Sequence, residues 1–183
     1  EATIQVEVEA GKLGRLRTFF EKGTSRVLHL SCYGHPEQLT FENGTGSVEI
    51  LEVEELRSLV QSAKCPLQLV VVNSFYSGRI GRVFLEAGVP HVVCCHHTET
   101  FRDKAASHFT KNLYHALASN KSLKQAFHLA KEAVRINDFS KNIDRYVLLP
   151  QKAENDFYHD IPVFFTKPVP PSGIMGNPFE SMP

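Results

Sequence analysis

Short apolar runs of strand length alternate with helix-spaced apolar patterns along most of the chain. The strand-like runs cover residues 3–8, 27–30, 38–42, 67–72, 91–95, 146–149 and 162–165. Helical spacing of apolar residues occupies segments 11–22, 52–63, 78–87, 105–117 and 123–134. Because parallel strands are joined by crossovers that are usually helical, the alternation predicts an α/β fold with a mainly parallel sheet.

Two of these runs have the pattern of strands that are covered on both faces. Residues 67–72 and 91–95 are apolar at nearly every position, as a strand inside a parallel sheet must be. The first run alternates instead, with Ile4, Val6 and Val8 apolar, which predicts a half-buried strand.

Local signals indicate where several elements begin and end. Gly23 is placed to end the first helix, and Asn43-Gly44 is typical of a hairpin turn. Residues 31–36, which include Gly34 and Pro36, are typical of a loop. Capping-box spacing precedes the last two helices, in the pairs Thr100 with Asp103 and Ser122 with Gln125.

The composition changes near residue 167, where proline and glycine become frequent. This indicates one folded domain over residues 1–166 and a Pro/Gly-rich linker or tail over residues 167–183. A total of 183 residues fits that division. The chain begins at Glu1 without an initiator methionine or signal peptide, so we expect it to be a fragment of a longer protein.

The charge balance argues against several partner classes. The 20 Lys and Arg residues equal the 20 Asp and Glu residues, so electrostatics gives no reason to expect nucleic acid or acidic lipid as the main partner. Hydrophobic residues make up 42% of the chain, which is ordinary for a globular domain. No apolar run reaches the length of a transmembrane helix, so we expect no membrane span.

The four cysteines lie in or beside apolar runs of a domain large enough to fold without disulfides. We therefore expect reduced thiols and a cytoplasmic location. The sequence Cys94-Cys95-His96-His97 contains four metal-ligand types in a row, but neighbours on a strand point to opposite faces and cannot surround one tetrahedral ion. A two-ligand contribution from Cys94 and His96 is sterically possible, yet the pattern favours neither a metal nor another cofactor.

Candidate functional residues follow two of the predicted strands. In an open parallel sheet, ligands gather at the carboxyl ends of the strands. One such end is segment 31–35 and the other is segment 73–78, and both are small and polar directly after an apolar run. The alternative is that both segments are ordinary turns. The candidate cleft residues are Tyr33, Gly34, His35, Ser74, Phe75, Tyr76, Ser77 and Gly78.

The same segments carry a resemblance to a known family. Residues 28–34 read LHLSCYG, residues 70–77 read VVVNSFYS, and residues 84–90 read FLEAGVP. Together with segments 105–117 and 121–126, in this order, they resemble the CHAT domain family, which belongs to the clan of caspases and separases. The resemblance implies a three-layer, caspase-like sandwich with a mainly parallel central sheet and helices on both faces.

The resemblance also implies where catalytic residues would lie. Active members carry a His-Gly pair after the first strand and a nucleophilic Cys after the second. Carried over by position, the His falls on Tyr33 and the Cys on Phe75, while Gly34 matches the family glycine. Phenylalanine has no nucleophilic atom, and a tyrosine hydroxyl with a pKa of about 10 is a poor base at neutral pH. The family's peptidase activity is therefore not expected here.

Three functional hypotheses follow. The first is a pseudopeptidase that binds a protein or peptide, a scaffolding module of a larger intracellular protein whose neighbours, by family resemblance, are repeat or NTPase modules. The second is a cysteine- or serine-type peptidase with displaced residues drawn from Cys32, His35, Ser74 and Ser77. In an extended strand, alternation would place His35 on the side of Tyr33 and turn Cys32 away. The third is a small-molecule sensor at the helix that begins with Gly78, where anions can bind.

Overall fold

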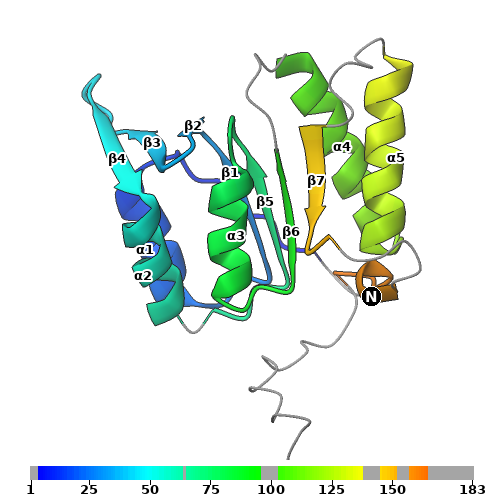
Figure 1. The fold of residues 1–183 in the computed structure, drawn as a ribbon, viewed down its shortest axis with the longest axis horizontal. Helices are drawn as coiled ribbons and strands as arrows, with labels where there is room; N and C mark the ends of the chain where they lie inside the picture. The colour runs from blue at the N-terminus through cyan, green and yellow to red at the C-terminus, as the bar shows by residue number, and fades with distance from the viewer. Residues whose placement is uncertain (1–3, 64, 96–102, 138–144, 152–156, 165–183) are drawn as a thin grey trace, which may run out of the picture.

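The computed structural model describes residues 4–63, 65–95, 103–137, 145–151 and 157–164. Within them, seven strands form two sheets and five α-helices pack around these sheets (Figure 1). The strands are β1 (Val27–Ser31), β2 (Tyr33–His35), β3 (Gln38–Glu42), β4 (Val48–Glu52), β5 (Leu69–Asn73), β6 (His91–Cys95) and β7 (Tyr146–Leu149). The helices are α1 (Leu13–Lys22), α2 (Val53–Ser62), α3 (Gly78–Glu86), α4 (Asp103–Ala118) and α5 (Leu123–Ile136), with a short 3-10 helix η2 (Phe157–His159).

The central sheet has the order β1-β5-β6-β7. Strands β1, β5 and β6 are parallel, and β7 adds an antiparallel edge beside β6. Residues of β5 and β6 are buried almost throughout, as their continuous apolar runs predict. The α/β prediction with a mainly parallel sheet is confirmed.

Helices cover both faces of the central sheet. Alternate side chains of the inner strands divide between two apolar clusters, because successive side chains of a strand point to opposite faces. Val70 and Val72 join the cluster formed with α1, α2 and α3, whereas Leu69 and Val71 join the one formed with α4 and α5. Figure 1 shows α3 and the α4–α5 pair on opposite sides of the strands. The predicted three-layer arrangement is therefore present.

Element ends follow the local signals where the structure describes them. Gly23 ends α1 in the left-handed conformation, with a φ of 59° that glycine adopts without steric cost. Ser122 and Gln125 form the predicted capping box at the start of α5. Thr100, which belongs to the other predicted capping box, lies outside the described residues.

Two predicted strands are wrong over their described parts. Residues 4–8 form no strand, and Val6 and Val8 are exposed, since no neighbouring strand pairs with them. Residues 162–164 form no strand, and residues 163–164 form a turn. Val163 is nevertheless buried against the α4–α5 cluster, which shows that an apolar run satisfies burial without joining a sheet.

The second sheet was only partly predicted. Segment 31–36 was expected to be a loop, but residues 33–35 form β2, which pairs antiparallel with β3. The expected hairpin turn at Asn43-Gly44 does connect β3 to a strand, but β4 itself was not predicted. The order β2-β3-β4 leaves β2 at one edge of this sheet.

The predicted tail over residues 167–183 lies outside the described residues, so the proposed domain boundary stays a prediction. In the described part of the chain, no helix is both long and apolar enough to cross a membrane.

Candidate functional site

The carboxyl ends of β1 and β5 lie side by side, as a parallel sheet requires. Ser31 at the end of β1 is in register with Asn73 at the end of β5. The two candidate segments that follow these residues therefore leave the sheet next to each other. Topology alone brings together two stretches that are separated by about forty residues of sequence.

Gly34 is the point of closest approach between these segments. A Cβ atom placed on Gly34 would lie 1.9 Å from Ser74 Oγ and 2.3 Å from the Phe75 carbonyl oxygen. Both distances are far below van der Waals contact, so only glycine fits against this backbone. The glycine that resembles the family's position is therefore required here for packing.

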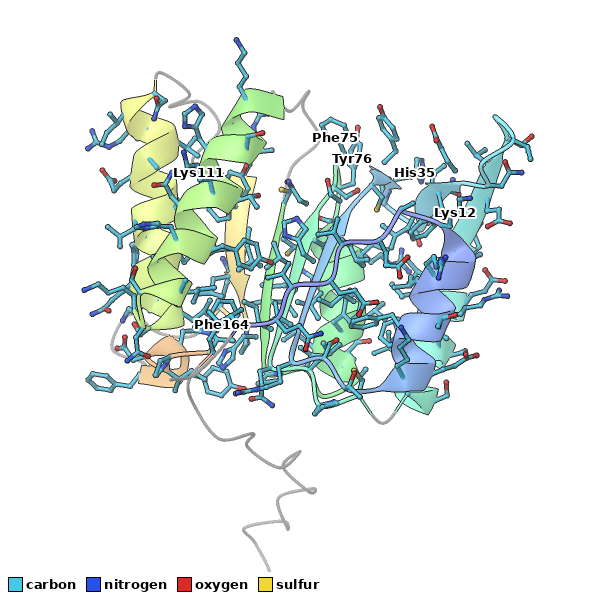
Figure 2. All side chains as sticks on the ribbon, turned by 180° about the vertical axis from the view of Figure 1, so that it is seen from behind. Lys12, His35, Phe75, Tyr76, Lys111 and Phe164 are labelled. Atoms are coloured by element: carbon cyan, nitrogen blue, oxygen red, sulfur yellow. The ribbon has the colours of Figure 1, made fainter. Side chains whose placement is uncertain are left out.

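Tyr76 follows Phe75 in an unusual backbone conformation. Its φ of 55° lies in the left-handed region, which costs a residue with a Cβ about 1 kcal/mol or more. Its ring lies near that of His35, with centroids 6.5 Å apart. Figure 2 shows Phe75, Tyr76 and His35 at the same end of the sheet. The chain bends sharply after β5, directly at the candidate site.

An open groove of about 690 Å³ lies at this end of the sheet, on the side covered by α4. The strand ends supply one wall and a face of α4 supplies the other. Its lining residues are His29, Ser31, Cys32, Tyr33, Asn73, Ser74, Phe75, Cys95, Ala106, Ser107, Thr110 and Lys111. Figure 2 shows Lys111 on α4, across from the labelled residues that follow β5.

The structure places the predicted site residues in two groups. Tyr33, Ser74 and Phe75 line the groove. The other candidates are not part of its described lining: Gly34, His35, Tyr76, Ser77 and Gly78. The groove therefore lies at the end of the sheet that the sequence predicted, but only three of the eight predicted residues line it.

Alternation holds within β2, where Tyr33 and His35 are both exposed and Gly34 between them is half-buried. Cys32 packs against the cluster formed with α1, α2 and α3, away from the exposed face of Tyr33, although Cys32 and Tyr33 both belong to the groove lining and His35 does not. The chain bends at Cys32 between β1 and β2, so the two strands do not form one continuous extended segment. Strict alternation applies only within a single strand.

Ser77 is a structural hydroxyl. It is fully buried, accepts a hydrogen bond of 2.8 Å from the Cys95 backbone N–H, and donates one of 3.1 Å to the Val72 carbonyl oxygen. These bonds join the carboxyl ends of β5 and β6. A hydroxyl enclosed in this way has no free approach to a substrate carbonyl.

The thiol of Cys32 is held in its protonated form. Burial raises the pKa of Cys32 to about 11, although a hydrogen bond with the Ser74 side chain acts in the opposite direction. Because the thiolate is the nucleophilic form, very little of it exists at neutral pH. Burial likewise raises the pKa values of Cys94 and Cys95 to about 12. All four cysteines are free.

His29 forms the floor of the groove without facing a nucleophile. Its Nδ1 lies 3.0 Å from the Tyr114 hydroxyl, and the two rings are stacked. Burial lowers the pKa of His29 and raises that of Tyr114, so both side chains are neutral at pH 7. This pair fixes α4 to β1 and thereby sets the width of the groove.

The start of α3 is occupied by protein contacts. Arg79, the second residue of α3, forms an ion pair with Glu37 from the β2–β3 turn. No side chain caps the helix through a hydrogen bond at Ser77. The small-molecule sensor hypothesis therefore gains no supporting contact here.

Cys94 and Cys95 confirm the geometric reasoning about adjacent ligands. Cys94 packs into the α1–α3 cluster and Cys95 into the α4–α5 cluster on the opposite face of the sheet. His96 and His97 lie outside the described residues. Among the residues that are described, no group of three potential ligands lies close enough to hold one metal ion.

The wall formed by α4 was not anticipated. Ser107, Thr110 and Lys111 belong to a segment chosen only for its apolar spacing, and their sequence separation from the strand ends gave no reason to connect them with the site. One signal was available, because spacings of three and four residues place these three side chains on one helix face. When a helix packs against a sheet, polar side chains on one of its faces indicate that this face either lines a groove or lies on the protein surface.

The comparison with known families agrees with the fold. The family description that matches is the CHAT domain, over residues 2–159. No curated protein is detectably similar in sequence. The match spans nearly all of the described residues, including both strand ends and α4, and a mainly parallel sheet between helical layers is the architecture of this caspase-like peptidase family. The chain therefore belongs to the CHAT domain family.

Proposed function

We propose that this CHAT domain is non-catalytic and binds an extended peptide segment of a protein partner in the groove at the carboxyl end of its sheet. The observation that carries the proposal is the pair of aromatic residues on the groove, Tyr33 and Phe75. By resemblance, these are the positions of the family's catalytic His and Cys. Neither replacement supplies the chemistry that peptide hydrolysis needs.

Neighbouring groups do not compensate for the loss. Cys32 is held as a thiol with a pKa of about 11, and Ser77 is enclosed by its hydrogen bonds to Val72 and Cys95. Ser74 donates to the Phe75 carbonyl oxygen at 3.3 Å and also bonds the Cys32 side chain. His35 is exposed beside Tyr76 and does not line the groove. A nucleophile with an adjacent base is not assembled from these residues.

The groove has features that suit an extended peptide. The strand that carries Tyr33, β2, is an edge strand of its sheet, so its outer backbone groups can pair with an added strand. Tyr33 is 76% exposed and offers a large aromatic surface at low conformational cost. Hydroxyl and amide side chains along the walls supply hydrogen bonds for orientation.

The setting belongs to the same proposal. We propose that the domain is one module of a larger intracellular protein, for which the family suggests repeat or NTPase modules as neighbours.

The first experiment tests whether the site is chemically inert. The folded protein is treated with thiol- and serine-directed peptide electrophiles, and adducts are read by intact mass. We expect no labelling of Cys32, Ser74 or Ser77 in the folded state, and cysteine labelling only after denaturation. Labelling of one of these residues that disappears in a His35→Ala variant would instead establish the alternative, a peptidase with displaced catalytic residues.

The second experiment tests binding. Fluorescent pentapeptide mixtures are titrated with the wild-type protein and with Tyr33→Ala, and binding is followed by polarisation. The matched control is Phe157→Ala, because Phe157 is a comparably exposed aromatic residue, at 79%, on η2. We expect Tyr33→Ala to weaken binding about tenfold and the control to leave it unchanged. Failure of every mixture to bind the wild type would refute the peptide-binding role.

A further inference from the structure

We propose that the α4 wall of the groove recognises an acidic side chain, so that the bound peptide carries an Asp or Glu opposite Thr110 and Lys111. This inference rests on the peptide-binding function proposed above and specifies the partner's chemistry. It is carried by the charge of the groove lining together with one buried hydroxyl that has no partner.

The first observation is the arrangement of polar groups on α4. Thr110 and Lys111 follow Ser107 by three and four positions, so the three side chains lie on one side of the helix. That face looks onto the strand ends that carry Tyr33 and Phe75. A peptide lying along the strand ends therefore has two hydroxyls and one ammonium group beside it.

The second observation is the charge of the lining. Among the described lining residues, Lys111 is the one formally charged side chain, and none is Asp or Glu. His29 contributes no charge, because burial lowers its pKa below the usual value. No described residue forms an ion pair with Lys111. The described part of the groove is therefore positively charged, and its cation is not used by the fold.

The third observation is independent of charge. The Oγ1 atom of Thr110 is buried and has no hydrogen-bond partner among the described residues. A buried hydroxyl without a partner destabilises the free protein. Because Thr110 belongs to the groove lining, a rotation of its side chain toward the groove would let a ligand oxygen accept its hydrogen and remove that cost. Thr110 and Lys111 both line the groove, so one ligand group lying in it can reach both.

These groups select a carboxylate among the side chains of a peptide. A carboxylate accepts hydrogen bonds through both oxygens and carries the charge that pairs with an ammonium group. A neutral amide can accept from Thr110 but gains no ion pair. A Lys or Arg side chain meets a like charge and offers no acceptor to the hydroxyl.

The test uses N-acetylated, C-amidated fluorescent pentapeptides in which one position at a time is Asp, Glu, Asn, Gln or Lys. We expect at least one position at which Asp or Glu binds the wild type about tenfold more tightly than the matching amide. Lys111→Met removes this preference, and Thr110→Val reduces it. Lys121→Met is the matched control, since Lys121 is an exposed lysine that follows the end of α4, and it keeps the preference.

Folding of the variants is read separately. Because the Thr110 hydroxyl is unpaired in the free protein, Thr110→Val should not lower the melting temperature, so weaker binding by this variant is attributable to recognition. The preference should also shrink as salt is raised from low to physiological concentration, as expected for a partly exposed charge pair.

The outcomes separate this inference from the function on which it rests. If no peptide of any composition binds, the proposed peptide-binding function fails and this inference fails with it. If peptides bind without a preference for Asp or Glu, the acidic selectivity is wrong while peptide binding stands. If the preference survives Lys111→Met, its assignment to the α4 wall is wrong and the inference is overturned. Tighter binding of the same peptides made with a free C-terminus, with no preference among the amidated ones, would replace the acidic side chain by a terminal carboxylate and also overturn the inference.

Discussion

Polar side chains differ between the two ends of the central strands. We call the side where the parallel strands begin the amino edge, and the side where they end the carboxyl edge. At the amino edge, where β6 begins, His91 and His159 are buried with their Nδ1 atoms 2.9 Å apart. His159 Nε2 lies 2.9 Å from the Pro150 carbonyl oxygen, which can only accept, so Nε2 carries a proton. In the neutral pair, Nδ1 of His159 accepts from the Nδ1–H of His91. Both imidazoles are thus partnered within the fold.

At the carboxyl edge, polar groups are left partly unpaired beside an opening. Thr110 Oγ1 is buried without a partner among the described residues, and Lys111 has no ion pair there. The polar groups of the amino edge are paired within the fold, whereas those of the carboxyl edge are the groups that we propose to bind a ligand. Changes at the amino edge should therefore alter stability and its pH dependence, and changes on the groove wall should alter binding.

The largest expected effect is the pH dependence of stability at the amino edge. Burial, and then the neighbouring His159, lower the pKa of His91 from 6.5 to about 4. The unfolded chain therefore binds more protons between these values, so this contribution is complete above pH 6.5 and is lost as pH falls to 4. The loss amounts to about 3 kcal/mol, because each pKa unit corresponds to about 1.4 kcal/mol. Urea unfolding between pH 7 and pH 4 measures it.

A variant assigns that loss to its source. His91→Asn places an amide N–H near the Nδ1 position without a titrating group, and it should remove most of the decrease between pH 6.5 and 4. His115→Asn replaces an exposed histidine of α4 and should leave the decrease intact. An unchanged pH profile in His91→Asn would show that the amino edge does not use this pair for folding.

The next effect concerns the junction that supports the groove. Gly34→Ala forces a Cβ against Ser74 and the Phe75 backbone, and we expect a loss of roughly 2–3 kcal/mol in the free energy of unfolding. Gly14→Ala in α1 is the control, because no atom lies within 4 Å of the added carbon. Equal stability of the two variants in urea would mean that the strand ends are not in close contact.

A slightly smaller effect is expected for the hydroxyl that joins β5 to β6. Ser77→Ala leaves the Cys95 N–H without its acceptor and the Val72 carbonyl without this donor, at a cost of about 2 kcal/mol. Ser58→Ala, on the exposed side of α2, should change the unfolding free energy by less than about 0.5 kcal/mol. If Ser77→Ala instead retains full stability but loses reactivity toward serine-directed electrophiles, Ser77 is a reactive residue after all.

The smallest expected stability change is at Tyr33. Because this side chain is largely exposed, Tyr33→Ala should alter the unfolding free energy by no more than about 0.5 kcal/mol while weakening peptide binding. This result would sharpen the contrast between the two edges. A large stability loss with unchanged binding would place Tyr33 among the folding residues.

Several features of the fold could be predicted because they depend on local physics. Continuous apolar runs identified β5 and β6, since a strand covered on both faces cannot carry polar side chains. Gly23 and the Ser122–Gln125 pair were predicted as helix boundaries from the backbone groups that such residues satisfy. The short motifs of the family added the order of these elements and the two strand ends at which a site would lie.

Other features failed because they depend on partners distant in sequence. The alternation of residues 4–8 is that of a strand, but no described strand pairs with it. Segment 33–35 contains Gly34 and precedes a proline, yet β3 provides a ladder that makes it a strand. The proximity that requires glycine at position 34 could not be inferred from its own neighbours, because the atoms that exclude a Cβ belong to Ser74 and Phe75.

By itself, the sequence determined that Phe75 carries no nucleophile, that the inner strands are buried and that charges balance, because these properties belong to residue types and local patterns. Tertiary structure decided which residues form the groove. It placed Ser107, Thr110 and Lys111 opposite the strand ends, turned His35 out of the lining and brought Cys32 into it. The physical reason is that the groove is formed by packing between α4 and the sheet, a contact that no local stretch of sequence specifies.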